Sequence, residues 1–402
     1  MAILCLGGGV AALDAQALFY LGPFVMRELH ITNSQVGLLS AAVLLTWALS
    51  GFSTSVLSDR SGGRKQYVVA AFLLFGVFSF LSGLARSWWL LLMARLLIGL
   101  AEGPIVPLTH AIMIAESSPG RRGFNMGMVQ SVGAQLVGSS VSPLLLVWLA
   151  TEFSWRNAFF LAGLPGIAVA LLVLAFIRDP VANRPAAGGP APPKRVLAQV
   201  RELVRTRNIR LCALASCFLN AWYFGALTFM PLYLVRLLHL APRQMSVVMA
   251  SSGVGAVFSA AVVPLLSDRF GRRPTMTVFA LLGSVGPLGM LTPVAGLMPL
   301  MAFAFVGAWA QGVLPLCIGT VPMESTSNRS ATASGLMMAV GMISGGLIGP
   351  AVCGRLADLF DLTAPLWICG GAALAAAVAC SGLVETAPAA LRRAAAQPIA
   401  RP

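Results

Sequence analysis

The chain has 402 residues, of which 58% are apolar and only 10% are charged, and its mean hydropathy is +0.85. Soluble domains are about 45–50% apolar and about 25% charged, so this chain has too few charged side chains to cover a water-soluble fold. The net charge of +14 does not indicate nucleic-acid binding, because the arginines stand in short clusters between apolar runs. The composition therefore predicts a membrane protein.

A membrane-spanning helix needs about 20 predominantly apolar residues, and the sequence contains twelve runs of about that length. We do not expect the first run to be a cleavable signal peptide, because it has no basic segment before it, carries Asp14 at its centre and is followed by eleven similar runs. In chain order the predicted spans are 2–26, 35–57, 66–85, 88–113, 125–150, 156–177, 209–234, 244–267, 274–294, 297–321, 331–354 and 362–384.

The sixth and seventh spans are separated by residues 178–208, which are rich in Pro, Gly and Ala and then basic. This composition predicts a linker that ends in a short amphipathic helix on the membrane surface. The linker divides the chain into one six-helix bundle at 1–177 and another at 209–384, and the second bundle is followed by a tail at 385–402. Most Lys and Arg residues lie in the linker, in the tail and in the loops on the same side of the membrane as the linker. The positive-inside rule therefore predicts that both termini are cytoplasmic.

Two loops of the first half recur in the second half. The loop LSDRSGGRK begins at Leu57, and LSDRFGRR begins at Leu266; ESSPGRRGFNMG begins at Glu116, and ESTSNRSATASG begins at Glu324. Both pairs match at nearly the same offset along the chain. The sequence is therefore a duplicated six-helix unit, which is common among secondary transporters.

These loops resemble the signature of the major facilitator superfamily, which is close to G-x-L-x-D-R-x-G-R-R between the second and third spans. The resemblance covers essentially the whole chain and implies an all-α membrane protein of twelve helices in two pseudo-symmetric bundles. It also implies that the charged residues of the two loops form a conformational gate by pairing with neighbouring helix ends; the alternative is positive-inside charge alone. The expected gate residues are Asp59, Arg60, Arg64, Asp268, Arg269 and Arg272.

The fourth span reads RLLIGLAEGPIVP from Arg95, and the first places Asp14 nine residues before Pro23. Both features resemble the anion:cation symporters, which carry sugar acids and other organic carboxylates, and the first span also resembles that of aromatic-acid:proton symporters. The chain departs from these families at Ala15, where the former usually have arginine, and at Ala11, where the latter usually have a second aspartate.

Few ionisable residues lie inside the predicted spans, where a charge costs at least about 2.5–3.5 kcal/mol. They are Asp14 in the first span and Arg95, Glu102 and His110 in the fourth. Arg95 and Glu102 are two helical turns apart, so they share one face of a helix. A carboxylate there can exchange a proton as its surroundings change, and we expect Glu102, with Asp14 second, to couple transport to protons. A structural ion pair, or an Arg95 reaching towards the interface, is the alternative; His110 is expected to be structural.

Arg95 is also the expected charge partner of an anionic substrate. The second half offers polar and aromatic side chains in place of charges, and these suit a partly apolar organic ligand, although packing remains the alternative for each of them. The expected substrate-binding residues are Arg95, Gln16, Asn220, Trp222, Tyr223, Trp309 and Gln311.

The sequence thus predicts a secondary transporter that takes up a small organic anion together with protons, acts as a monomer in a plasma or bacterial inner membrane and needs no cofactor or nucleic acid. The alternative is an exporter of drugs or metabolites that exchanges them for protons. It is disfavoured because Gly138 is followed by Ser139, where such exporters commonly carry proline. We do not expect an enzyme, because no nucleophile–base pair, metal cluster or nucleotide-binding loop is visible.

Overall fold

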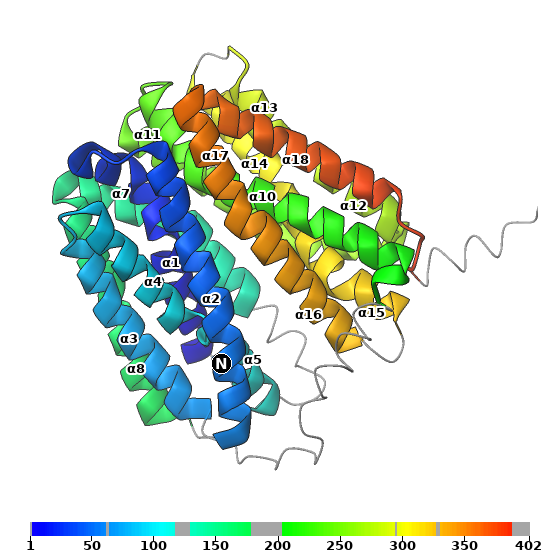
Figure 1. Ribbon diagram of the computed structural model, residues 1–402, viewed down its shortest axis with the longest axis horizontal. Coiled ribbons are helices and arrows are strands. Elements are labelled where there is room, and N and C mark those ends of the chain that lie inside the picture. The colour runs from blue at the N-terminus through cyan, green and yellow to red at the C-terminus, as the bar shows by residue number, and fades with distance from the viewer. Residues whose placement is uncertain are drawn as a thin grey trace, which may run out of the picture. The chain divides into compact units, whose positions relative to one another are not determined.

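The computed structural model describes residues 2–61, 64–116, 129–177, 203–293, 296–326 and 330–387 (Figure 1). Every regular element that these residues form is a helix, as the sequence predicted. Within the described ranges, eleven helical stretches are long and apolar enough to cross a membrane. Large apolar side chains such as Leu171 and Phe176 are exposed, at 58% and 71%. Such an apolar surface is unsuited to water and fits contact with lipid.

The helices of the first half follow the predicted spans closely, because each apolar run forms helix until polar or turn-forming residues end it. Ser87 and Ser154, for example, begin α4 and α8 by accepting hydrogen bonds from the backbone N–H groups of Leu90 and Asn157. The elements are α1 (Ala2–Leu29), α2 (Asn33–Ser61), α3 (Arg64–Gly83), α4 (Trp88–Glu102), α5 (Ile105–Glu116), the wide π-type helix η2 (Val129–Val141), α7 (Ser142–Glu152) and α8 (Trp155–Phe176).

The second half is more interrupted. Its elements are α10 (Arg207–Arg236), α11 (Pro242–Phe270), α12 (Arg272–Leu282), α13 (Val285–Met290), α14 (Leu297–Gly307), η3 (Ala308–Val313), η4 (Leu316–Thr320), α15 (Val321–Ser325), α16 (Ser330–Val340), η5 (Gly341–Leu347), α17 (Ile348–Leu359) and α18 (Thr363–Ser381). The amphipathic helix predicted at the end of the linker falls mostly on residues outside the described ranges.

The predicted span 274–294 differs from the structure, which has two short helices there, α12 and α13, separated at Gly283 and Ser284. The indole Nε1 of Trp222 on α10 donates a hydrogen bond of 2.9 Å to the Gly283 carbonyl oxygen at this break. A side-chain donor thus pairs with a carbonyl group at the helix end. This hydrogen bond lowers the free-energy cost of interrupting a helix in an apolar environment.

Glycines bring neighbouring helices of the first half into close contact. A Cβ atom added at Gly163 on α8 would lie 2.7 Å from the Gly76 carbonyl oxygen on α3, and one added at Gly133 on η2 would lie 2.6 Å from the Cys5 carbonyl oxygen on α1. The α1–η2 and α3–α8 pairs therefore pack backbone against backbone, the arrangement in which small residues stabilise membrane helices. The core of this half lies between α1, α3, α5 and α8 and includes Phe72 and Phe75.

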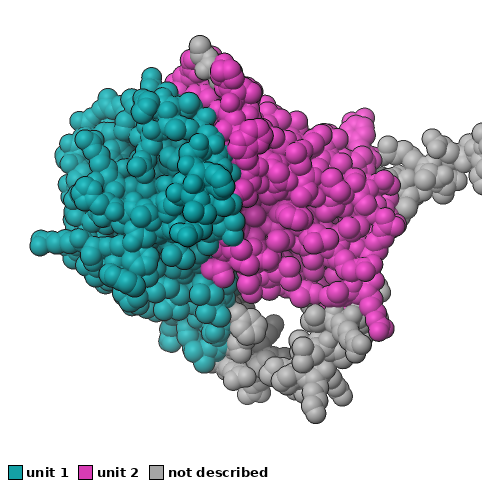
Figure 2. All heavy atoms as spheres, turned by 45° about the horizontal axis from the view of Figure 1, so that its top comes forward, with its two compact units in different colours: residues 1–188, 227–257, 350–365 teal, residues 189–226, 258–349, 366–402 magenta. Residues whose placement is uncertain are grey.

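The chain groups into two compact units (Figure 2). Unit 1 comprises residues 1–188, 227–257 and 350–365, and unit 2 comprises residues 189–226, 258–349 and 366–402. The boundary runs through α10 and α11, so it does not coincide with the duplicated halves; the bundles at 1–177 and 209–384, with their linker and tail, stay a prediction. Each unit is considered by itself below.

Candidate functional site

Three ionisable side chains lie buried together in unit 1. Asp14 on α1 is 0% exposed, and Arg95 and Glu102 on α4 are 1% and 3% exposed. The Arg95 guanidinium interacts electrostatically with both carboxyl groups, and Asp14 interacts with Glu102 as well. The structure therefore brings together the three residues that the sequence singled out, across two helices.

The position of Glu102 follows from the way α4 packs and ends. A Cβ atom at Gly103 would clash with the Trp47 carbonyl oxygen and the Ser50 hydroxyl on α2, so glycine lets the two backbones meet. The Ser50 hydroxyl also donates a hydrogen bond of 3.1 Å to the Gly99 carbonyl oxygen. The helix stops at Glu102 and resumes as α5 after Gly103 and Pro104, which places the carboxyl group at a break in the span.

Several polar atoms of this cluster are buried without a hydrogen-bond partner among the described residues. They are Oδ2 of Asp14, Oε1 of Glu102, and Nε and Nη2 of Arg95. The Arg95 guanidinium instead lies over the Phe159 ring, 4.6 Å from its centroid. Buried polar atoms are normally hydrogen-bonded, so these four unpaired atoms on a cation and two neighbouring carboxyl groups make the cluster a candidate binding or proton-exchange site.

The other oxygen of Asp14 has a well-defined partner on α3. The Ser79 hydroxyl donates to Oδ1 of Asp14 at 2.5 Å and also lies 3.0 Å from the Phe159 carbonyl oxygen on α8. The sequence gave no reason to select Ser79, because serine is common in membrane helices and its spacing from Asp14 carries no pattern.

Gln16 follows Asp14 by two residues on α1, and its side-chain amide is already hydrogen-bonded. The Tyr20 hydroxyl donates to Oε1 of Gln16 at 2.7 Å, and Nε2 of Gln16 donates to the Ser139 hydroxyl at 3.2 Å. The Ser139 hydroxyl can in turn donate to Oε1 of Gln135 at 3.2 Å. These bonds join α1 to η2, and a direct substrate contact by Gln16 would require one of them to exchange.

The residues expected to bind substrate from the second half lie in unit 2, and most of them have structural partners. Asn220 Nδ2 donates to the Ser216 carbonyl oxygen at 2.8 Å, and Trp222 uses its only donor for Gly283. Trp309 on η3 stacks on Phe279 with ring centroids 5.6 Å apart. Tyr223 and Gln311 are half-buried. A substrate role for these five residues stays a prediction, and it is weakest for Trp222.

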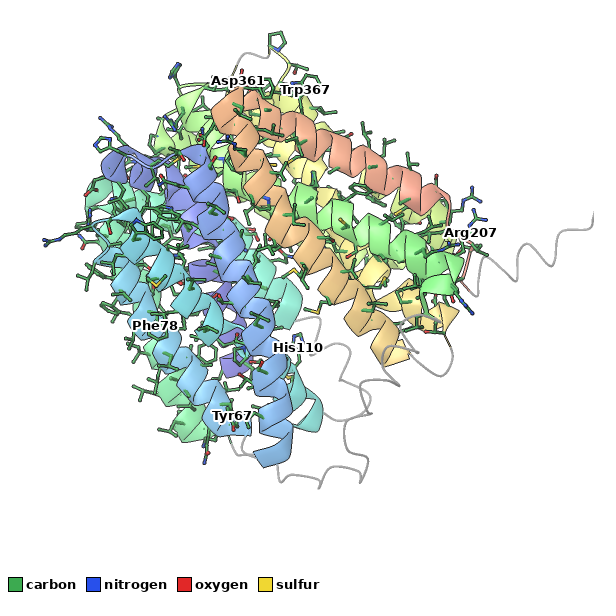
Figure 3. All side chains as sticks on the ribbon, in the orientation of Figure 1. Tyr67, Phe78, His110, Arg207, Asp361 and Trp367 are labelled. Carbon is green, nitrogen blue, oxygen red and sulfur yellow. The ribbon has the colours of Figure 1, made fainter. Side chains whose placement is uncertain are left out.

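His110, which is labelled in Figure 3, lies on α5 and is half-buried. The structural role expected for it stays a prediction. Among the described residues no group of three or more His, Cys, Asp or Glu side chains is placed to hold a metal ion.

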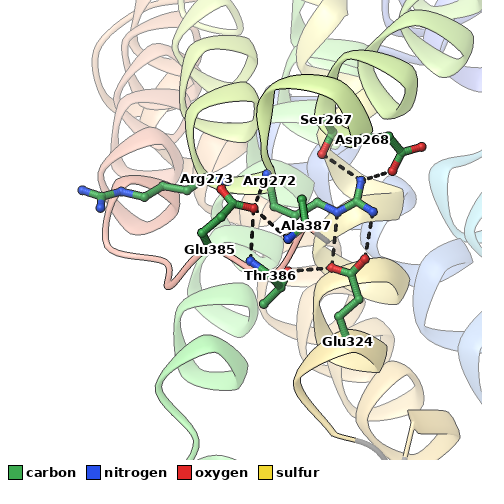
Figure 4. A network of polar contacts seen from close by, with 8 residues as sticks. All are labelled: Ser267, Asp268, Arg272, Arg273, Glu324, Glu385, Thr386 and Ala387. Atoms are coloured by element: carbon green, nitrogen blue, oxygen red, sulfur yellow. Dashed lines mark hydrogen bonds and ion pairs between the residues drawn. The ribbon is translucent and has the colours of Figure 1, made fainter. Parts of the chain in front are cut away.

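The second of the two repeated charged loops, for which a gate role stays a prediction, forms a charged network within unit 2 (Figure 4). Arg272 makes a two-point contact with Glu324, of which the Nη2–Oε1 distance is 2.8 Å, and its Nη1 pairs with Oδ1 of Asp268 at 2.5 Å. Burial lowers the pKa of Arg272, but hydrogen bonds and charge from Glu324 and Asp268 outweigh it and raise the pKa overall. Arg269 lies on the Phe270 ring, 5.4 Å from its centroid. The side chains of Asp59, Arg60 and Arg64 lie outside the described set.

Glu385, which sequence reasoning did not single out, completes this network. Its Oε1 accepts from the backbone N–H of Arg272 at 2.7 Å, and its Oε2 accepts from that of Arg273 at 3.1 Å. The carboxylate thereby caps the start of α12, where the helix dipole favours negative charge. The charged loop is thus held to α15 and to the segment after α18.

Unit 1 also contains contacts between α17 and the first half of the chain. The Asp358 carboxylate accepts hydrogen bonds from the backbone N–H groups of Asn33 at 2.9 Å and Ser34 at 2.8 Å, so it caps the start of α2. A Cβ atom at Gly354 would lie 2.6 Å from the Asn33 carbonyl oxygen, which shows how closely these two helices approach. The two halves are therefore in direct contact at this end of α2.

The family model described as Major Facilitator Superfamily matches residues 4–348 and again 234–401. A probable 4-methylmuconolactone transporter of Cupriavidus pinatubonensis is 28% identical over 353 residues, covering 84% of this chain and 82% of that protein. A hexuronate transporter of Bacillus subtilis is 25% identical over 372 residues, covering 88% and 86%. A quinolone resistance protein of Staphylococcus aureus is 24% identical over 360 residues, covering 89% of each.

Solved structures share the fold. A bacterial homologue of the human lysosomal transporter Spinster, in an inward-facing and unoccupied conformation, matches with a TM-score of 0.75 at 19% identity, over 94% of this chain and 93% of that one. A D-xylose–proton symporter matches with a TM-score of 0.75 at 17% identity, over 96% and 98%. At these identities the likeness concerns the arrangement of the helices alone.

Proposed function

Because the chain belongs to the major facilitator superfamily, and is therefore an integral membrane transporter and not an enzyme, we propose that it takes up a small organic anion together with protons. The observation that carries this proposal is the buried cluster of Arg95 with Asp14 and Glu102. Arg95 supplies the positive charge that attracts the anion, and the carboxyl groups take up and release the proton. The hexuronate transporter among the relatives supports an organic acid as the substrate class.

The mechanism follows from the change in surroundings as the carrier alternates between the two sides of the membrane. A carboxyl group in an apolar site holds its proton more tightly, while one beside a guanidinium or water releases it more readily. The unpaired Nε and Nη2 of Arg95 can receive a substrate carboxylate, for which the planar guanidinium is well suited. Such a carboxylate competes with Glu102 and Asp14 for Arg95, which makes substrate binding and protonation depend on each other.

We propose that both termini face the cytoplasm, because most Lys and Arg residues lie in the linker, the tail and the loops on their side. Under a proton gradient directed into the cell, a symporter that moves protons and substrate together takes its substrate up.

The test is Glu102→Gln in reconstituted vesicles, measured with a labelled hexuronate as the first of a panel of carboxylates. The Gln side chain keeps the size of Glu102 but fixes the site in a neutral state. We expect accumulation driven by a proton gradient to be lost, while exchange of substrate across the membrane without a gradient largely survives. Asp14→Asn should show the same separation, or lose binding as well if Asp14 contacts substrate. If Glu102→Gln still concentrates substrate as the unchanged protein does, Glu102 is structural and coupling occurs elsewhere.

The second candidate is an exporter that exchanges a drug or metabolite for protons, and the quinolone resistance protein among the relatives favours it. The two functions differ in the direction of proton movement. Adding substrate outside right-side-out vesicles should make a symporter carry protons inwards with it. In an exporter of this kind, protons move in the opposite direction to the substrate, so the same addition should drive protons out of the vesicles.

A further inference from the structure

The Ser79 hydroxyl on α3 lies between two oxygen acceptors. One is Oδ1 of Asp14 on α1 at 2.5 Å, and the other is the Phe159 carbonyl oxygen on α8 at 3.0 Å. A hydroxyl group carries one hydrogen, so it donates to one of them at a time, but its oxygen can accept a hydrogen bond as well. Ser79 is 0% exposed and Asp14 is 0% exposed, so the protein itself must satisfy these groups.

The position of Ser79 is fixed by the close packing of α3 on α8. A Cβ atom at Gly163 on α8 would lie 3.1 Å from the Ser79 Cβ and 2.7 Å from the Gly76 carbonyl oxygen. One turn further along, a Cβ atom at Gly83 would clash with the Phe160 ring. The backbone and Cβ of Ser79 therefore cannot move away from Asp14 without separating two helices, whereas the hydroxyl hydrogen can turn between its two acceptors.

The charged groups that face Asp14 among the described residues come from α4. They are Arg95, which favours the ionised form of Asp14, and Glu102, which disfavours it when it is itself ionised. α3 contributes the Ser79 hydroxyl, and α8 contributes the Phe159 carbonyl oxygen and the ring beneath Arg95. Ser79 thus provides the direct hydrogen bond to Asp14, while the charges act at longer range.

We propose that Ser79 is a positioning residue that responds to the protonation of Asp14 by turning its hydroxyl between Asp14 and Phe159. This inference rests on the proposed role of Asp14 in proton coupling. When Asp14 is ionised, Ser79 donates to its Oδ1. When Asp14 takes up a proton on Oδ1, that proton is donated to the Ser79 oxygen, and the Ser79 hydrogen turns to the Phe159 carbonyl oxygen.

This exchange keeps the hydrogen bonds balanced in both states. Each state has one bond between Asp14 and Ser79, and the second state adds one to the Phe159 carbonyl, which can accept it on its remaining lone pair. The buried site can then gain or lose a proton without leaving a donor unpaired. Because the Phe159 ring lies under the Arg95 guanidinium, the switch also links the proton on Asp14 to the residue that holds the cation.

The test is Ser79→Ala, with Ser82→Ala as its matched control. Ser82 is a buried serine on the same helix, and among the described residues its hydroxyl bonds to the Phe78 carbonyl oxygen of its own helix alone. Ser79→Ala removes a charge-assisted bond from the ionised form and a neutral bond from the protonated form. The charge-assisted bond is about twice as strong, so Asp14 should take up its proton at a pH about 1 unit higher. Ser82→Ala should leave that pH unchanged. Ser79→Thr keeps the hydroxyl, so Asp14 should take up its proton at the same pH as in the unchanged protein.

The measurement is the infrared band of the protonated carboxyl group, recorded against pH on the purified full chain. The Asp14 band is identified by its loss in Asp14→Asn, so the experiment does not require the variants to transport. A band whose midpoint is the same in Ser79→Ala and the unchanged protein overturns the inference, even if Ser79→Ala lowers the melting temperature. If no Asp14 band appears at any accessible pH, Asp14 is not a proton site, and its part in the proposed function fails along with this inference.

Discussion

At the scale of single residues, Arg95 is the side chain on which anion binding is expected to depend. Arg95→Lys keeps the charge but loses the planar fork and the delocalised face that rests on Phe159, so we expect substrate affinity to fall about tenfold or more. Arg95→Ala should abolish binding. The measurement is substrate affinity by calorimetry or a thermal-shift titration on purified protein.

The matched control is Arg156→Lys. Arg156 also stacks on an aromatic ring, 4.3 Å from the Trp155 centroid, but it pairs with Glu28 at the end of the helices. This substitution should leave substrate affinity unchanged. Normal binding of an organic anion by Arg95→Ala would contradict an electrostatic role and favour a neutral or cationic substrate.

The sequence could identify Asp14, Arg95 and Glu102 because a charged residue inside an apolar run is costly and therefore conspicuous. It could not identify Ser79 or the partners of Gln16, because a hydroxyl or amide in a membrane helix becomes informative only when the neighbouring helix is known. Trp222 shows the reverse limit: its hydrogen-bonding tip suggested a ligand contact, whereas in the structure the tip donates to the carbonyl at a helix end, and its substrate role stays a prediction.

At the scale of helices, the contact between α2 and α4 depends on glycine. An added Cβ at Gly103 meets backbone and side-chain atoms of α2, so we expect Gly103→Ala to cost about 1–3 kcal/mol by overpacking and to displace Glu102. The control is Gly335→Ala on α16, where an added Cβ meets nothing within 4 Å and alanine should be neutral or slightly stabilising. Thermal unfolding in detergent compares the two, and equal melting temperatures would contradict close packing at Gly103.

The extents of most helices could be predicted from apolar runs, because a long helix with satisfied backbone groups is the default within a membrane. The division of 274–294 into α12 and α13 could not, because the run remains apolar on average across Gly283 and Ser284. What permits the break is a donor from α10, which lies far away in the sequence. Glu324 was recognisable through the internal repeat, whereas Glu385 has no counterpart in the repeated loops and is 113 residues from Arg272.

At the scale of the whole molecule, alternating access requires contacts that hold one end of the carrier closed and are broken in the other state. We predict that Asp358 makes such a contact, because its two backbone hydrogen bonds join α17 of the second half to α2 of the first. We expect Asp358→Ala to increase labelling of a cysteine introduced at this end, while affinity measured in a locked conformer stays nearly unchanged.

Asp361→Ala is the matched control for Asp358→Ala. Asp361 lies three residues further on, and within the described part of the chain its hydrogen bonds go to the start of α18 alone, through Thr363 and Ala364. These bonds lower the pKa of Asp361, but they do not connect the halves. Equal labelling in both variants would remove Asp358 from the gate. The same assay tests Asp59→Asn and Asp268→Asn, for which we expect a changed balance of conformers without a change in substrate affinity.

The cap that Glu385 places on α12 has a consequence for how the protein is made. The ribosome must complete the last apolar helix before residue 385 exists, so Arg272 and Arg273 emerge long before the carboxylate that binds their backbone. During synthesis the beginning of α12 therefore has four open amide groups and an arginine without this neighbour. Glu385 follows shortly after α18, the last predicted span in the sequence. The hydrogen bonds that hold the loop at Arg272 and Arg273 can therefore form only when synthesis has passed residue 385.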